Sequence, residues 1–205
     1  PPQLVIQFTN RCNARCPQCG MRVNAKFSRS TLSRETLKRI LDAAAAKGVT
    51  ILSFTGGETL LDLDELVELI TYAGTVGIPF VRTGTNGFLF RGSHRPDFED
   101  RINRLAQRLA ATCLRNFWIS LDSAYAEVHE QMRGLDGVVA GIEKALPLFH
   151  AHGLYPAANL GINRQLAGAV TQNLRADRFA SPEAYLSAFY DCFCDAFDRF
   201  YRFTR

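Results

Sequence analysis

The sequence predicts an α/β fold built on a parallel β-sheet, and three observations support this prediction. The chain has 205 residues, 47% of them hydrophobic and 21% charged, which is enough to bury the core of one globular domain. Short apolar, β-prone runs alternate with segments of helical periodicity, at a spacing of about 30 to 45 residues that is typical of βαβ units. Glycine-rich or polar segments follow the first three runs, at the strand ends where parallel sheets bind ligands.

Five apolar runs are the expected strands: Leu4–Phe8, Val49–Phe54, Pro79–Arg82, Phe117–Leu121 and Tyr155–Leu160. Between them, apolar residues recur at intervals of three and four over residues 37–44, 63–70, 98–109 and 138–149, which are the expected helices. Ser33 is the expected N-cap of the first helix and Gly48 its end, while Pro147 should kink or shorten the fourth helix.

Residues 182–205 form a tail of a different kind, because eight of them are aromatic. Their spacing predicts one helix with a broad apolar face. No apolar run that would form a sixth strand follows, so the pattern is that of βα units cut short. The chain also lacks an initial Met, and we expect it to be a processed or truncated piece of a longer product.

The composition argues against several classes of partner. The net charge of +4 is mild and no dense basic run occurs, so nucleic acid is not an expected partner. No apolar run approaches the ~18 residues of a membrane span, and the first residues do not resemble a signal peptide. We therefore expect a cytoplasmic protein with no membrane partner.

Six cysteines are the most informative part of the composition. Cys12, Cys16 and Cys19 crowd into the loop after the first strand with the spacing C-x3-C-x2-C, and the other three lie far along the chain. This clustering, without an export signal, indicates a metal or cluster site in a reducing compartment. A structural zinc site is one interpretation, but it requires four ligands, usually in paired C-x2-C units, and only one such unit is present.

An iron–sulfur cluster fits the three cysteines better than zinc does. A [4Fe–4S] cluster is normally held by four thiolates, so three thiolates leave one iron without a protein ligand. That open iron can chelate a substrate or a cofactor. The sequence therefore favours a cluster with one open iron, and zinc stays as the alternative.

The cysteine spacing, in the loop after the first strand, resembles the signature of the radical S-adenosylmethionine (radical SAM) superfamily. Phe54-Thr55-Gly56-Gly57-Glu58 resembles the motif with which that family holds the methionine amino group of SAM. The glycines allow close approach of the backbone, and Glu58 can pair with an ammonium group. The resemblance extends along the chain as far as the fifth expected strand.

Other segments resemble further SAM-binding positions of the family. Thr85 and Asn86 match the end of its third strand, and Ser120 and Asp122 match a fourth-strand segment that often contacts the SAM ribose. Arg133 ends an H-x3-R stretch whose arginine often pairs with the SAM carboxylate.

Three further positions complete the comparison with the family. Asn159 lies on the fifth strand, where the family places a residue that contacts adenine or methionine. Gln18 stands where an aromatic residue usually packs near the adenine, and Thr59 stands where a proline often follows the motif glutamate. The polar side chain of Gln18 offers hydrogen bonds at that position in place of an aromatic ring.

The resemblance implies a partial (β/α)6 TIM-like barrel, truncated at its C-terminus, with a barrel core over residues 1–165 and a helical segment over residues 166–205. The implied activity is reductive cleavage of SAM at a [4Fe–4S] cluster, giving methionine and a 5′-deoxyadenosyl radical that abstracts hydrogen from substrate. The H-x3-R-G stretch resembles the subgroup with molybdopterin-biosynthesis and peptide-maturing members, which implies a peptide or small-metabolite substrate.

The implied partners are SAM, that substrate, and a reductant such as flavodoxin or ferredoxin, and the sequence identifies no catalytic residue. A zinc-binding interaction module and an iron–sulfur electron carrier without SAM chemistry are the alternatives. Cys192 and Cys194 lie two apart on the expected tail helix, so they point to different faces. An auxiliary cluster would use them, but two small buried side chains are the favoured interpretation.

Overall fold

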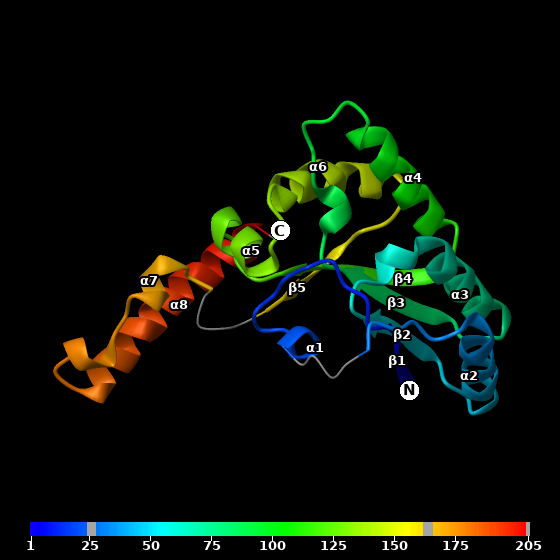
Figure 1. Ribbon diagram of the computed structural model, residues 1–205, viewed down its shortest axis with the longest axis horizontal. Helices are drawn as coiled ribbons and strands as arrows, with labels where there is room; N and C mark the ends of the chain where they lie inside the picture. The colour runs from blue at the N-terminus through cyan, green and yellow to red at the C-terminus, as the bar shows by residue number, and fades with distance from the viewer. Residues whose placement is uncertain (24–27, 162–165, 204–205) are drawn as a thin grey trace.

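A computed structural model describes residues 1–23, 28–161 and 166–203 of the chain (Figure 1). Five strands form one parallel sheet in the order β1-β2-β3-β4-β5, so each new strand is added beside the previous one. They are β1 (Gln3–Thr9), β2 (Ile51–Gly56), β3 (Phe80–Thr85), β4 (Leu114–Leu121) and β5 (Ala157–Leu160). The predicted α/β class is confirmed, and each expected strand overlaps an observed one.

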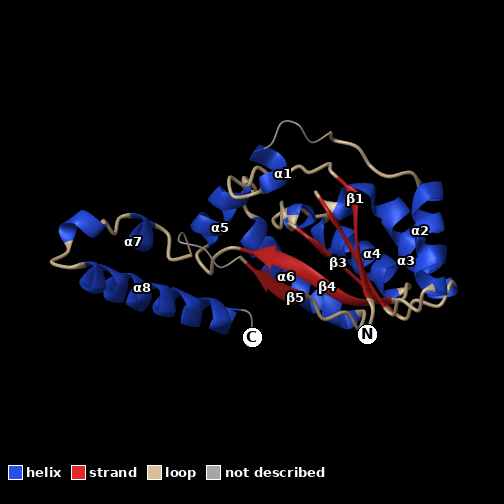
Figure 2. Ribbon diagram, turned by 90° about the horizontal axis from the view of Figure 1, so that it is seen from below, coloured by secondary structure: helices blue, strands red, loops and turns tan. Residues whose placement is uncertain are grey.

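The four long helices that connect the strands lie on one side of the sheet (Figures 1 and 2). They are α2 (Arg34–Ala46), α3 (Leu63–Thr75), α4 (Phe98–Ala110) and α6 (Val138–Ala151). Shorter elements occupy the loops at the C-terminal ends of the first four strands: α1 (Gly20–Val23), η1 (Thr59–Asp62), η2 (Phe88–Phe90) and α5 (Ala126–Arg133).

The apolar core lies between the sheet and these four helices. Leu52 and Phe54 of β2 are completely buried there, with Leu37 of α2, Ile70 of α3 and Phe149 of α6. Because side chains alternate along a strand, the residues between these core positions face the opposite side of the sheet. We call that side, which is turned away from the four helices, the inner face.

The predicted helix ends are largely confirmed. The side chain of Ser33 accepts a hydrogen bond from the amide of Thr36 at the start of α2, and Gly48 follows its end with a φ of 73°. Helix α6 continues past Pro147 to Ala151, so the proline does not shorten it.

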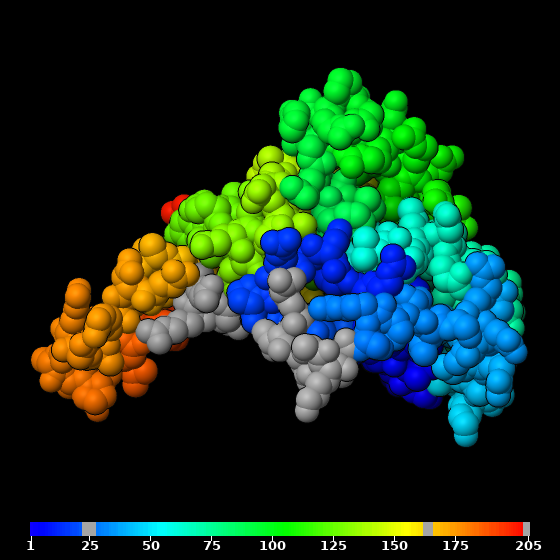
Figure 3. All heavy atoms as spheres, viewed as in Figure 1, coloured from blue at the N-terminus to red at the C-terminus, as the bar shows by residue number. Residues whose placement is uncertain are grey.

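The C-terminal residues form an arm of three elements, α7 (Ala169–Gln172), η3 (Ala176–Arg178) and α8 (Pro182–Phe203), which extends away from the sheet (Figures 1 and 3). The predicted aromatic helix is therefore present as α8. Its last turns return to the body, where Phe200 joins the main core and the Arg199 guanidinium lies 4.7 Å from the ring centre of Tyr125. The predicted division after residue 165 falls at residues 162–165, which lie outside the described part.

Within the described residues, no helix combines the length and the apolar character that crossing a bilayer requires.

Candidate functional site

A cavity of about 320 Å³ opens at the C-terminal ends of the strands, and most of the predicted site residues line it. Its volume is in the range of small-molecule pockets. The predicted residues that line it are Cys12, Cys16, Gln18, Cys19, Gly56, Gly57, Glu58, Thr85, Asn86, Ser120, Asp122 and Arg133. Asn159 is not among the lining residues; it lies exposed on β5, in register with Ser120 of β4.

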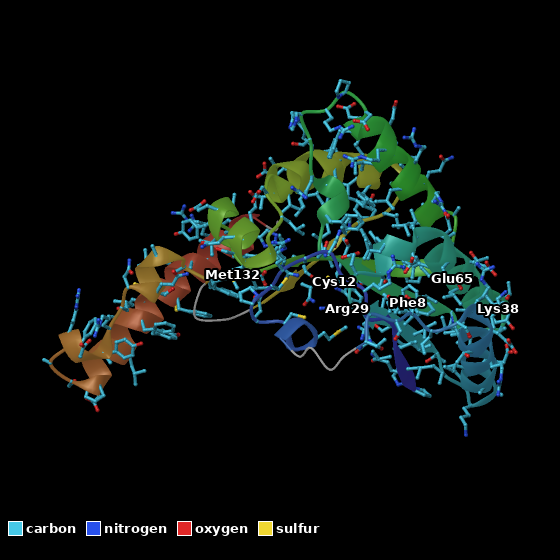
Figure 4. All side chains as sticks on the ribbon, viewed as in Figure 1. Phe8, Cys12, Arg29, Lys38, Glu65 and Met132 are labelled. Atoms are coloured by element: carbon cyan, nitrogen blue, oxygen red, sulfur yellow. The ribbon has the colours of Figure 1, made fainter. Side chains whose placement is uncertain are left out.

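The three clustered cysteines are free thiols that meet at this cavity. Cys12 is exposed and Cys16 is buried, and burial raises the pKa of the Cys16 thiol. Figure 4 labels Cys12 and Arg29, and both residues line the cavity. Among the described residues, no three Cys, His, Asp or Glu side chains are arranged to hold a single metal ion.

Two glycines at the end of β2, Gly56 and Gly57, allow the strand end to contact the cysteine loop. A Cβ atom on Gly56 would lie 2.2 Å from the Thr9 carbonyl oxygen, and one on Gly57 would lie 2.0 Å from that of Arg11. The Gly57 amide donates to the Thr9 carbonyl at 2.7 Å, and the Glu58 amide donates to the Arg11 carbonyl at 2.8 Å. The glycines thus fix the cysteine loop against β2, in addition to leaving backbone open to the cavity.

Glu58 connects the second strand to the third. Its side chain is 1% exposed, and one carboxyl oxygen, Oε1, accepts hydrogen bonds from the Leu60 amide at 3.0 Å and the Thr85 hydroxyl at 2.9 Å. The other oxygen, Oε2, accepts from the Asn86 amide at 2.6 Å. Burial raises the pKa of Glu58 to about 7, although all three hydrogen bonds oppose that rise. The carboxyl group is therefore poised to lose its proton when a cation enters the cavity.

Asn86 connects the third strand to the cysteine loop. Its side-chain amide donates to Asn13 Oδ1 at 3.0 Å and lies 3.7 Å from the sulfur of Cys12. Its Oδ1 accepts from the amide of Phe88, which holds the side chain in place. The end of β3 thereby presents a hydrogen-bond donor to one of the three sulfurs.

Asp122 and Arg133 form a largely buried ion pair on the far wall of the cavity. Nε and Nη2 of Arg133 donate to the two carboxylate oxygens of Asp122 at 2.6 and 3.0 Å. Asp122 also donates its backbone amide to Nδ1 of His129 at 3.1 Å. His129 must accept through Nδ1 and is therefore neutral, and burial lowers its pKa to about 4.

The backbone of α5 also holds the cysteine loop. The Arg15 amide donates to the Arg133 carbonyl at 2.7 Å, so the loop that carries Cys16 is tied to the same residue that forms the ion pair. Three strand ends and α5 therefore converge on the three sulfurs.

Sequence reasoning did not identify Trp118, which also lines the cavity. It lies on β4 opposite Gly84 of β3, and a Cβ atom on Gly84 would be 2.1 Å from the indole Nε1. The signal was available, because Trp118 precedes Ser120 by two residues on a predicted strand and must therefore share its face.

A sequence profile described as the radical SAM superfamily matches residues 6–161, which is well over half of the chain. The chain belongs to the radical SAM superfamily. The radical SAM chain is 30% identical over 186 residues to the GTP 3′,8-cyclase of Campylobacter jejuni, a match that covers 87% of this chain and 50% of the cyclase. It is 29% identical over 147 residues to the AdoMet-dependent heme synthase of Methanosarcina barkeri, covering 69% of this chain and 38% of the synthase.

Solved structures agree on the fold of this radical SAM chain. Streptococcus suis SuiB bound to S-adenosylmethionine matches with a TM-score of 0.62 at 20% identity, over 84% of this chain and 37% of SuiB. The parallel five-stranded sheet therefore confirms the predicted partial barrel. The chain spans half or less of the length of these relatives.

The superfamily is one of enzymes that use a [4Fe–4S] cluster and SAM, and this chain carries the superfamily's domain over residues 6–161. The cavity suits both groups. It combines three free thiols with a buried carboxyl group for a cation and a paired arginine for an anion.

Proposed function

We propose that this chain is the core of an enzyme that cleaves SAM reductively at a [4Fe–4S] cluster and abstracts hydrogen from a peptide or small metabolite. The observation that carries the proposal is the meeting of Cys12, Cys16 and Cys19 with Glu58 and Arg133 in one cavity. When bound, the cluster and SAM supply the electron transfer and the 5′-deoxyadenosyl radical; the protein binds, orients and shields them.

The three cysteines are the proposed cluster ligands, and the surrounding backbone holds them in place. Hydrogen bonds from Gly57 and Glu58 to the cysteine loop fix its start, and the bond from Arg15 to the Arg133 carbonyl fixes its middle. The side-chain amide of Asn86 would donate to the Cys12 thiolate and lower its electron density.

Glu58 and Arg133 are the proposed holders of the methionine end of SAM. Burial disfavours the charged form of Glu58, and an ammonium group near it would favour that form. Arg133 uses Nε and Nη2 on Asp122, which leaves Nη1 to donate to a carboxylate. The two side chains would therefore recognise opposite charges of the same ligand.

The other predicted SAM contacts are proposed with roles that fit their positions around the cavity. Ser120 lines the cavity and is the proposed ribose contact, whereas both carboxylate oxygens of Asp122 already accept from Arg133. Asp122 therefore acts by positioning Arg133. Gln18 is the proposed neighbour of the adenine. Asn159, which is exposed, has the least structural support as a SAM contact.

The proposal also covers the electron donor and the location. A flavodoxin or ferredoxin is the proposed reductant, because the cluster must be reduced before SAM is cleaved. The six free thiols favour a reducing compartment such as the cytoplasm.

Anaerobic reconstitution followed by reduction and addition of SAM tests the proposal. We expect a brown protein with about four irons per chain that forms 5′-deoxyadenosine. Cys16→Ala should lose the cluster. Glu58→Ala should keep the cluster and bind SAM more weakly, while the exposed Glu35→Ala serves as its control. A colourless protein with stoichiometric zinc, or a brown protein that does not cleave SAM, would overturn the proposal in favour of one of the two alternatives.

A further inference from the structure

The inner face of the sheet carries a polar layer below the cofactor cavity. Ser53 of β2 pairs in register with Arg82 of β3, and Arg82 pairs with Asn116 of β4, so the three side chains share one face. Gly84, two residues further along β3, lines the cavity. At about 3.3 Å per residue, the polar layer begins about 7 Å deeper than Gly84.

This layer differs from the usual interior of a βα barrel. Such interiors are filled mainly by branched apolar side chains that pack in layers. A serine, an arginine and an asparagine at neighbouring positions do not form such a packed layer. A few polar groups placed next to a cavity are instead suited to fixing the orientation of a ligand.

Arg82 is the charged member of this layer, and its charge is not neutralised within the described residues. The guanidinium Nε donates to the hydroxyl of Ser53 at 2.7 Å, and Ser53 is 2% exposed, so the group is held in a fixed direction. None of the ion pairs formed by the described residues includes Arg82. A half-buried guanidinium that is held in one direction and has no ion-pair partner is suited to bind an anion, and its planar fork matches a carboxylate or a phosphate.

Trp118 stands between Arg82 and the cofactor cavity. It is two residues from Asn116 in one direction and two from Ser120 in the other, on the same face of β4. Its indole fills the space above Gly84, where any side chain would collide with it. The indole is therefore a wall against which a planar or apolar part of a ligand can pack.

We propose that Arg82 binds an anionic group, a carboxylate or a phosphate, of the substrate, and that Trp118 packs against the part of the substrate next to that group. The inference rests on the proposed function, because that function makes the space beside the cavity the place of the substrate. It adds the chemical class that this subsite recognises and the orientation in which the substrate enters, with its anionic group away from the cysteines.

Small probes test the subsite without knowledge of the substrate. Trp118 is the only tryptophan of the chain, so its emission reports on this site. The cluster-loaded protein would be titrated with phenyl phosphate, with benzoate and with neutral benzamide, by fluorescence and by calorimetry. We expect saturable binding of at least one of the two anions at millimolar concentration, with benzamide at least tenfold weaker. The tighter anion distinguishes a phosphate from a carboxylate.

Variants locate the site. Arg82→Gln should weaken anion binding at least tenfold, and Arg82→Lys should restore part of it. Arg115→Gln, which removes an exposed charge from the neighbouring strand, should bind as the wild type does. Equal affinity in Arg82→Gln and the wild type, or no saturable binding of either anion, would overturn the inference. The inference would also be overturned if Arg133→Gln lost anion binding while Arg82→Gln kept it, because the anion would then lie in the cofactor cavity.

The same preparations separate the two proposals. Formation of 5′-deoxyadenosine by the wild type tests the proposed function alone. Arg82-dependent anion binding in a protein that does not cleave SAM would leave the anion subsite standing and remove its link to radical chemistry. SAM cleavage with Arg82-independent binding would remove the subsite and leave the proposed function standing.

Discussion

The carboxylate of Glu58 accepts a hydrogen bond of 2.6 Å from the backbone amide of Asn86, which joins the ends of β2 and β3 at the floor of the cavity. Burial keeps this carboxyl group protonated up to a pH of about 7. Across the cavity, His129 is held neutral down to a pH of about 4. The two groups have opposite effects on the pH dependence of stability.

Glu58 and His129 should offset each other between pH 4.5 and 6.5. The raised pKa of Glu58 gives stability that is present at low pH and is lost as pH rises from 4.5 to about 7. The lowered pKa of His129 makes stability rise with pH from about 4 to 6.5. Each contribution is about 3 kcal/mol at full extent.

Single variants should expose the two slopes. Relative to the wild type, the unfolding free energy of Glu58→Gln should rise by about 2 kcal/mol between the ends of that window, and that of His129→Asn should fall by about as much. Urea unfolding at several pH values, without SAM, measures both slopes. Parallel curves for the wild type and both variants would contradict the assigned pKa shifts.

The fold was predictable where local pattern determines structure. The apolar runs of all five strands and the Ser33 cap depend on residues close in sequence. Helix α5 was not predicted as a helix, because only His129 and Met132 of its eight residues are buried and its apolar period is too weak. The cluster site could be predicted because its three candidate ligands lie within one short segment.

The residues that line the site could be predicted from the sequence, but the hydrogen bonds and ion pair between them could not. The three donors to Glu58 include Thr85 and Asn86, which lie almost thirty residues away and approach only through the register of β2 and β3. The pairing of Asp122 with Arg133 spans a turn and a helix, so no local pattern reveals it. The contacts of Glu58 with Thr85 and Asn86 are determined by how the strands pair in the sheet.

The ion pair of Asp122 and Arg133 should show strong coupling. Arg133→Gln leaves a carboxylate that is 2% exposed without its partner, and we expect a loss of roughly 3 kcal/mol of stability. Asp122→Asn combined with Arg133→Gln should cost less than the sum of the single variants, because no buried charge is left. Chemical unfolding of the four proteins completes the cycle.

An exposed pair provides the control for that cycle. Arg175 and Asp177 are both more than half exposed, so Arg175→Gln should change stability by less than about 0.5 kcal/mol. Additive costs at Asp122 and Arg133 would show that the pair does not act as a unit.

Arg133→Gln should also bind SAM at least tenfold more weakly, which equilibrium dialysis measures.

Gly57→Ala should release the cysteine loop from β2. The new methyl group would lie 2.0 Å from the Arg11 carbonyl oxygen, and backbone atoms cannot move aside cheaply. We expect reduced iron and sulfide content after reconstitution. Gly20→Ala is the matched control, since it adjoins Cys19 and has no atom within 4 Å of the added methyl group. Equal iron content in both variants would contradict a structural role for Gly57.

Cys192→Ser combined with Cys194→Ser should leave the iron content unchanged. The two residues are partly buried on α8, two positions apart, so their side chains diverge around the helix. A hydrogen bond with Cys194 raises the pKa of Tyr190, one turn earlier, which is a contact within the arm. Iron and sulfide analysis of the double variant, beside Cys16→Ala, measures how many irons each cysteine group holds. A loss of iron from the double variant, with SAM cleavage retained, would instead assign Cys192 and Cys194 to a second cluster.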